Sequence, residues 1–114
     1  MNDEEPVIGV VGPCAAGKST LVKDLRALGY QARHIAQEHS YVQDMWKQIS
    51  NPDILIYLDV SFEISIMRSG SNWSKTIYDK QVQRLEHAKQ NTDLYINTND
   101  LSPEHVLEHV LKYL

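Results

Sequence analysis

The residues with the clearest chemistry form one run, Gly12 to Ser19, with the spacing Gly-x-x-x-x-Gly-Lys-Ser. This spacing is typical of a loop whose backbone N–H groups surround a phosphate. The glycines permit backbone angles that other residues disfavour, and the small side chains between them leave room for a ligand. The predicted phosphate-binding set is Gly12, Pro13, Cys14, Ala15, Ala16, Gly17, Lys18, Ser19 and the adjoining Thr20.

Two side chains of this run can act directly on a nucleotide. Lys18 supplies a positive charge for the outer phosphates, and Ser19 supplies a hydroxyl ligand for Mg²⁺. A helix that begins near Gly17 would add the positive end of its dipole. The run therefore predicts a site for an ATP-type nucleotide, with Mg²⁺ as the accompanying metal.

Three charged residues outside the run are candidates for the same site. Asp59 ends an apolar stretch, where it either holds Mg²⁺ through the water shell or orients the following turn. Glu38 is either a general base or metal partner, or one of an exposed pair with His39. Arg68 precedes the loop 69–72 and either stabilises phosphoryl charge or is surface charge. The predicted catalytic residues are Lys18, Glu38 and Arg68, and the predicted metal ligands are Ser19 and Asp59.

The elements that must position these residues alternate between strand-like and helix-like segments. Apolar, β-branched runs predict four strands, at residues 7–11, 31–35, 54–60 and 93–98. Amphipathic spacing predicts helices at residues 18–28, 62–68 and 74–90 and from residue 103 to the end. Residues 40–50 fit a short helix or an irregular connection. Serines precede three of these helices as N-caps: Ser61, Ser74 and Ser102.

This alternation predicts an α/β fold of the P-loop NTPase type, with a small parallel sheet flanked by helices. We expect one domain over residues 1–114. Ligands of such sheets bind beyond the carboxyl ends of the strands, which is where the phosphate loop falls. The core is expected to include Leu28, Ile77, Leu111 and Leu114, and Tyr41, Met45 and Trp46 are expected to pack locally. Trp73 either stacks on a base or anchors its loop.

Composition narrows the partners and the compartment. The formal net charge of -4 argues against binding to a nucleic-acid backbone. The sequence lacks an apolar run of the length that a membrane helix needs, so no membrane partner is expected. The single cysteine, Cys14, and the polar N-terminus fit a cytoplasmic protein. An exposed sheet edge can pair with another chain, so homo-oligomerisation stays open.

Four pieces of the sequence, in this order, resemble the P-loop kinase group that includes shikimate and adenylate kinases. They are the loop Gly12–Ser19, the strand end Tyr57–Val60, the segment that begins at Arg68, and the run 94–100 with its following helix. Members of this group are usually longer. Only residues 29–53 stand where they carry a further acidic strand and an acceptor-binding insertion, and Glu38 takes the place of the missing acid or nothing does.

The resemblance implies specific roles and two alternative functions. The loop after the late strand would bracket adenine through Thr98, Asn99 and Asp100, unless these residues form an ordinary turn. Arg68 would act from a lid-like segment. One implied function is a kinase that transfers the γ-phosphate of ATP to a small metabolite or nucleotide. The alternative is a nucleotide-dependent binding or regulatory module with little turnover.

Overall fold

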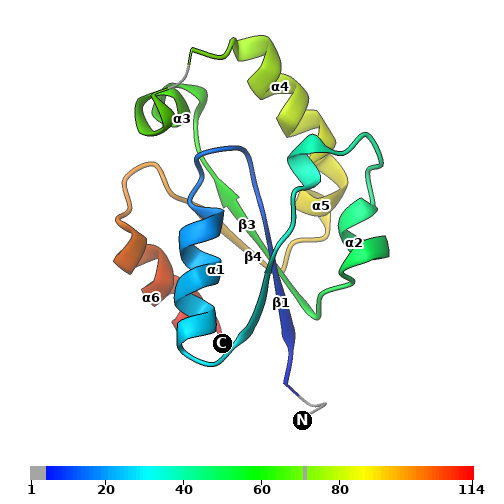
Figure 1. Ribbon diagram of the computed structural model, residues 1–114, viewed down its shortest axis with the longest axis vertical. Helices are drawn as coiled ribbons and strands as arrows, with labels where there is room; N and C mark the ends of the chain where they lie inside the picture. Colours follow the sequence, from blue (N-terminus) through cyan, green and yellow to red (C-terminus); the bar gives the residue numbers. More distant parts are fainter. Residues whose placement is uncertain (1–4, 71) are drawn as a thin grey trace.

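The computed structural model describes residues 5–70 and 72–114, so Ser71 of the expected loop 69–72 lies outside the described residues. The fold is α/β, with one four-stranded, all-parallel sheet flanked by helices (Figure 1). The strand order is β2-β1-β3-β4. The strands are β1 (Val7–Val11), β2 (Gln31–His34), β3 (Ile54–Asp59) and β4 (Leu94–Asn97). This arrangement is compatible with a P-loop NTPase-type fold, although it is not specific to it.

The helices follow the strands in the expected order. They are α1 (Lys18–Ala27), the 3₁₀ turn η1 (Gln37–His39), α2 (Met45–Ile49), α3 (Phe62–Ser69), α4 (Lys75–Arg84), α5 (Glu86–Gln90) and α6 (Pro103–Tyr113). Ser61, Ser74 and Ser102 each accept a hydrogen bond from an N–H group in the first turn of the helix that follows. All three predicted N-caps are therefore confirmed. Among the described residues, no helix is both long enough and apolar enough to cross a membrane.

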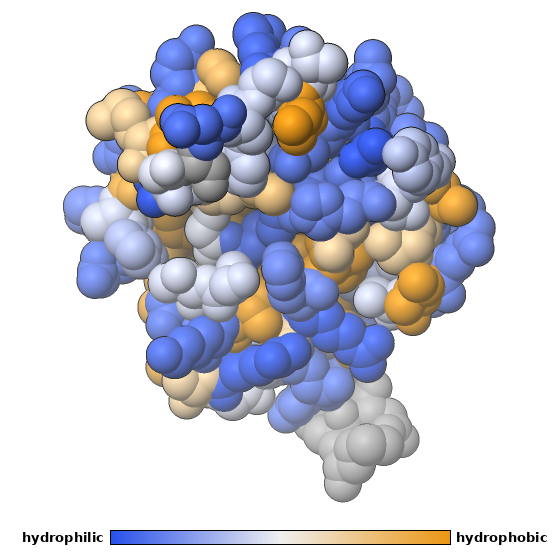
Figure 2. All heavy atoms as spheres, turned by 45° about the horizontal axis from the view of Figure 1, so that its top comes forward, coloured by the Kyte–Doolittle hydropathy of each residue, from blue (hydrophilic) through white to orange (hydrophobic). Residues whose placement is uncertain are grey.

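The carboxyl ends of all four strands meet at one edge of the sheet, because the strands are parallel. The segments that leave this edge are the loop after β1, the turn η1 after β2, and the connections after β3 and β4. Figure 2 turns this edge toward the reader and shows a largely hydrophilic surface with scattered apolar residues. Segments that are far apart in the sequence thus come together around residues 12–17.

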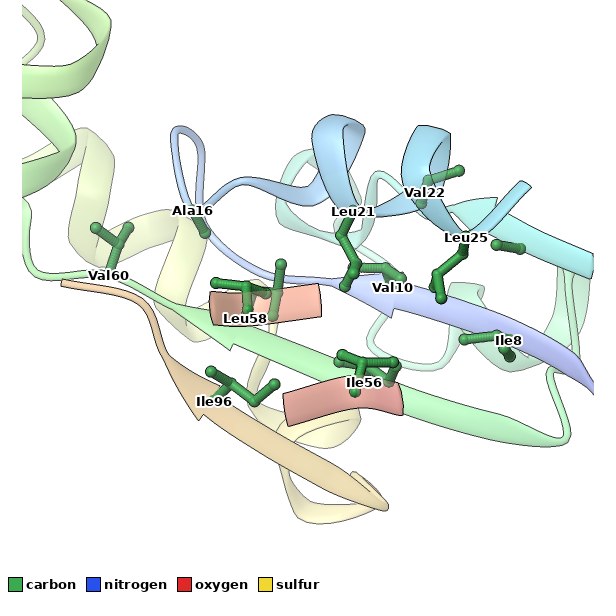
Figure 3. Packing of buried hydrophobic residues seen from close by; sticks show 13 residues of the cluster. Ile8, Val10, Ala16, Leu21, Val22, Leu25, Ile56, Leu58, Val60 and Ile96 are labelled. Atoms are coloured by element: carbon green, nitrogen blue, oxygen red, sulfur yellow. The ribbon is translucent and has the colours of Figure 1, made fainter. Parts of the chain in front are cut away.

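Two hydrophobic clusters hold the sheet between its helices. The first cluster packs α1 and α6 against one face, and Figure 3 shows Leu21 and Leu25 of α1 over Val10 and Ile8 of β1. The second cluster lies on the opposite face and contains Val11, Ile35, Trp46, Leu55, Tyr57, Leu85 and Ala88. Side chains alternate between the two faces along β1 and β3, which explains why these central strands are apolar throughout.

Some expectations about helices and core positions are wrong. The helix expected over 74–90 breaks at Leu85, whose N–H approaches the carbonyls of both Gln81 and Val82. This tightened turn lets Leu85 and Ala88 both enter the second cluster. Leu28, Ile77, Leu111 and Leu114 are exposed, because they lie at helix ends or on outward faces. Tyr41 is 86% exposed, whereas Trp46 is buried as expected.

Candidate functional site

The loop between β1 and α1 depends on unusual backbone angles. Gly12 has a φ of 153°, and a Cβ atom there would lie 2.0 Å from the carbonyl oxygen of Leu58. The loop therefore crosses β3 at a distance that only glycine allows. Ala15 adopts a φ of 66° and Gly17 a φ of 103°. The left-handed angle at Ala15 is strained for a residue with a side chain, at a cost of about 1–2 kcal/mol.

The first turn of α1 offers unpaired donors next to this loop. Gly17 caps the helix without a side-chain hydrogen bond, and the first turn contains no acidic residue. Within the described parts of the chain, the N–H groups of Gly17, Lys18 and Ser19 have no acceptor. The first N–H groups of a helix carry partial positive charge, so they attract an anion. The first turn of α1 can therefore accommodate an anion such as a phosphate.

Lys18 is folded back onto the loop and forms a buried ion pair. Its Nζ donates to the carbonyl oxygens of Gly12, at 2.5 Å, and Pro13, at 3.2 Å. It also donates to the carboxylate of Glu38, which η1 brings from β2, the neighbour of β1. The two side chains are only 5% and 4% exposed. The acid that faces the loop lysine is therefore Glu38.

Glu38 is paired on one side only. Lys18 binds Oε2, while Oε1 is buried and has no hydrogen-bond partner among the described residues. An unsatisfied buried carboxylate oxygen is costly, and such atoms commonly mark a place where water or an ion binds. Glu38 is thus a buried acid beside the loop with one oxygen that lacks a partner among the described residues.

An open groove of about 330 Å³ runs past this ion pair. Residues 14–20 form one of its walls, and His34, Glu38 and His39 form the other. Partial burial lowers the pKa of His34, and the positive charge of Lys18 lowers it further. The groove therefore combines unpaired backbone donors with several titratable side chains.

A second, narrower pocket of about 160 Å³ lies on the α6 side of the same loop. Its lining is largely apolar and comprises Ala15, Ala16, Gly17, Thr20, Leu21, Arg68, Thr98, Leu101, Pro103 and Val106. Four of these residues, Ala15, Ala16, Gly17 and Thr20, also line the groove. The two spaces therefore border the same loop between β1 and α1.

Arg68 joins the loop to the segment after β4. Its guanidinium donates to the carbonyl of Ala15 at 3.1 Å, to the hydroxyl of Thr98 at 2.9 Å, and to the Thr98 carbonyl. The Thr98 hydroxyl also lies within hydrogen-bond distance of the carbonyl oxygens of Ala16, at 3.0 Å, and Asp59, at 3.1 Å. Arg68 belongs to the last turn of α3 and forms a wall of the narrow pocket.

The structure does not bring every expected residue to the site. Asp59 accepts hydrogen bonds from its neighbour's N–H and from the hydroxyl of Tyr95, and it lines neither the groove nor the narrow pocket. β4 thus supplies the carboxylate with another partner, and the role of Asp59 as a metal ligand stays a prediction. Burial and the bond to Asp59 raise the pKa of Tyr95 to about 12.

The three residues after β4 also have different places. Thr98 is buried and faces the narrow pocket. Asn99 instead accepts a hydrogen bond from the N–H of Ser61, and Asp100 lines a separate surface groove along β4. Of the expected trio, only Thr98 lines the narrow pocket. Trp73 is half-buried, with its indole N–H unpaired among the described residues.

Sequence reasoning missed two features of the site. Gln81 of α4 accepts a hydrogen bond from the N–H of Cys14 at 3.0 Å and donates to its Sγ at 3.3 Å. No local pattern marks Gln81, since this contact joins residues 67 positions apart. Leu101, Pro103 and Val106 form apolar pocket walls. Their signal was present, because they immediately follow a strand whose carboxyl end lies beside the loop.

Models of known protein families do not match this chain, and neither do the sequences of curated proteins.

Proposed function

We propose that this chain binds an ATP-type nucleotide, with its phosphates in the loop 12–19 and its base in the narrow pocket. The observation that carries the proposal is the start of α1. Unpaired N–H groups and the Lys18 ammonium converge there on one open groove. A phosphate satisfies all of these donors at once. Few other common ligands combine high negative charge with enough acceptor oxygens.

The narrow pocket supports the placement of the base. Its volume of about 160 Å³ suits a flat ring rather than a whole nucleotide, and its walls are largely apolar. The planar guanidinium of Arg68 is held at the mouth by carbonyl groups, an orientation that suits contact with an aromatic ring. Because this pocket and the groove share part of the loop, one ligand can occupy both.

The residues around the groove fit a magnesium ion that accompanies the phosphates. Ser19 is exposed in the first turn of α1, and the orphaned oxygen of Glu38 is an oxygen ligand of the kind that Mg²⁺ prefers. Ser19 and Glu38 would hold it. A bound Mg²⁺ would offset part of the negative charge of the phosphates. Asp59 is not proposed for this role.

Binding would require Lys18 to change partners. Its ammonium now pairs with Glu38, and it would leave this carboxylate to reach the outer phosphates. Arg68 would keep its bonds to Ala15 and Thr98 and hold the base side of the loop in place. The protein's contribution is then positioning and charge rather than covalent chemistry.

Two functions follow from such binding. A kinase is favoured by the continuation of the groove beyond Lys18 to His34 and His39, where a small phosphate acceptor has room. A regulatory module with little turnover is favoured by the Lys18–Glu38 pair, since Glu38 is the only acid lining the groove among the described residues. Formation of ADP in a screen of acceptors with ATP and Mg²⁺ separates the two.

Calorimetric titration with ATP and with GTP, in Mg²⁺, tests nucleotide binding directly. We expect Lys18→Ala to weaken ATP binding by about 100-fold, because a charge-assisted hydrogen bond contributes roughly 1.5–3 kcal/mol. Lys23→Ala is the matched control, since Lys23 is an exposed lysine on the same helix. Unchanged ATP affinity in folded Lys18→Ala would refute the proposal. If that variant does not fold, Lys18→Arg keeps a cation beside Glu38 while altering the reach to phosphate.

A further inference from the structure

Three potential metal ligands of different chemistry converge from the two walls of the groove. They are the thiol of Cys14, the imidazole of His39 and the carboxylate of Glu38, and one ligand atom from each lies within 4.8 Å of the others. Cys14 comes from the phosphate loop, and the other two come from η1. The contact of loop and turn at the carboxyl edge of β1 and β2 creates this cluster.

The spacing of the ligand atoms is close to what a tetrahedral ion needs. Sγ of Cys14 lies 3.7 Å from Nε2 of His39, and this nitrogen lies 4.0 Å from Oε2 of Glu38. Ligands bound to Zn²⁺ at usual bond lengths and tetrahedral angles are roughly 3.3–3.6 Å apart. A small rotation of the exposed His39 side chain, together with a small approach of Cys14 and Glu38, whose ligand atoms lie within 4.8 Å, would therefore bring the three atoms around one ion.

Two further observations point to a cation here rather than to a chance cluster. The side chain of Glu38 is 4% exposed, yet its Oε1 has no partner among the described residues. A bound cation would satisfy that charge. In addition, the buried amide of Gln81 donates to Sγ of Cys14. A donor aimed at sulfur supports a thiolate, which is the form that binds metal.

The geometry points to a site for a thiophilic divalent cation of the Zn²⁺ type, held by Cys14, Glu38 and His39. On binding, the Cys14 thiol releases its proton to solvent and its sulfur donates an electron pair to the metal. No electron is transferred. Three protein ligands leave a fourth position for water. A magnesium ion on the phosphates would share only the carboxylate of Glu38 with this site, because hard Mg²⁺ does not favour sulfur ligands.

Lys18 competes with this cation for Glu38. Its ammonium holds Oε2, and its positive charge repels an ion at the cluster. Removal of Lys18 therefore frees the second carboxylate oxygen and strengthens metal binding. If Lys18 moves to a phosphate, as the proposed function requires, a metal ion would replace it as the partner of Glu38. Only this coupling rests on the proposed function. The metal site itself does not.

Titration with Co²⁺ under reducing conditions, without nucleotide, tests the site. Cobalt bound to a thiolate gives a charge-transfer absorption, and Zn²⁺ should displace it. We expect saturation at a single ion per chain and loss of the absorption in Cys14→Ser. His39→Asn should weaken binding by roughly tenfold or more. His34→Asn is the matched control, because His34 lines the same groove outside the cluster, and it should stay within a factor of about two.

The choice of variants keeps the test interpretable even if one of them fails to fold. His39 is 60% exposed, so His39→Asn remains informative even if a change in the loop impairs folding. Lys18→Ala should raise the Co²⁺ affinity, although it is expected to weaken ATP binding by about 100-fold. The metal site would be overturned by the absence of saturable absorption, by absorption that persists in Cys14→Ser, or by equal losses in His34→Asn and His39→Asn. Failure of ATP binding alone would leave it standing.

Discussion

The two sides of the phosphate loop are built in opposite ways. On the α6 side, the guanidinium of Arg68 contacts acceptors from Ala15, Thr98 and Asn99, and Thr98 is buried with its hydroxyl fully engaged. On the η1 side, a buried carboxylate has one oxygen without a described partner, and the wall beside it contains an exposed histidine. The polar groups of Arg68 and Thr98 on the α6 side thus have hydrogen-bond partners, whereas one buried oxygen on the η1 side has none among the described residues.

This difference indicates where ligand binding rearranges the protein. A pocket whose polar groups already have partners needs little reorganisation to accept a base. The η1 side holds a Lys18–Glu38 pair that must separate before the lysine can reach a phosphate. Buried pairs are costly to break one partner at a time. We therefore expect base affinity to depend on shape and phosphate affinity to depend on the competition for Lys18.

The largest effect on stability should come from a substitution that distorts the loop itself and thereby both of its sides. Gly12→Ala places a Cβ atom 2.0 Å from the backbone oxygen of Leu58, at a φ that alanine disfavours. We expect a loss of roughly 3 kcal/mol in the free energy of unfolding, measured by urea denaturation. Gly29→Ala is the control, because Gly29 also has positive φ but its Cβ meets nothing within 4 Å. A similar loss in both variants would contradict the close approach of loop and strand.

Glu38→Gln should change the η1 side without touching the narrow pocket. Lys18 then loses its charged partner in a buried place, and we expect a loss of about 2 kcal/mol in the free energy of unfolding. Glu108→Gln, on an exposed position of α6, is the control and should change little. Urea denaturation of the two variants without ligand measures the difference.

Glu38→Gln also tests whether the Lys18–Glu38 ion pair competes with ATP for the lysine. With ATP and EDTA present, the rise in melting temperature should be larger in Glu38→Gln than in the wild-type protein, because Lys18 no longer has to leave a carboxylate. EDTA removes Mg²⁺, so Glu38 cannot contribute to ATP affinity as a metal ligand. A smaller rise in the variant would show that the ion pair does not compete with phosphate.

On the α6 side, Arg68→Lys tests whether the planar guanidinium group is needed. One ammonium cannot reach the carbonyls of Ala15 and Thr98 and the Thr98 hydroxyl together. We expect a stability loss of about 1 kcal/mol. Adenosine affinity should fall more than pyrophosphate affinity, as calorimetry would measure. Arg33→Lys, at an exposed position of β2, is the control. Equal losses for both ligands would remove the distinction between the two sides.

The parts of this comparison that are local in sequence could be predicted from it. The loop 12–19 is contiguous, and the three serine caps act on residues only three positions away. The different surroundings of Asp59 and Glu38 could not be predicted, because Asp59 ends and Glu38 follows a strand that neighbours β1. The contact that sets Asp59 apart comes from Tyr95 of β4, 36 positions along the chain. Side-chain partners across strands leave no periodic signal.

The break at Leu85 has a similar origin. Residues 74–90 contain no glycine or proline that would end a helix. The turn tightens because Leu85 and Ala88 both pack against the second face of the sheet. Tertiary packing therefore determines the boundary, and the exposed positions Leu28 and Leu114 show the reverse case, in which apolar spacing continues beyond the part of a helix that packs.

The smallest expected effect uses His34 to report the charge on the η1 side. Its pKa is lowered from the ordinary 6.5, first by burial and then by Lys18, while Glu38 acts to raise it. As the pH falls through 6.5, the unfolded chain takes up a proton that folded His34 resists, so this residue reduces stability in acid and not above neutral pH.

Glu38→Gln removes the charge that raises the pKa of His34 and leaves Lys18 in place, so the pKa should fall further in this variant. Titration of the His34 ring protons by NMR measures the change, and the exposed substitution Glu108→Gln should not produce it. Phosphate bound in the loop should act in the opposite direction, because it offsets the charge of Lys18. If neither Glu38→Gln nor bound phosphate shifted the pKa of His34, the Lys18–Glu38 pair would lie away from the groove. The asymmetry between the two sides of the loop would then be contradicted.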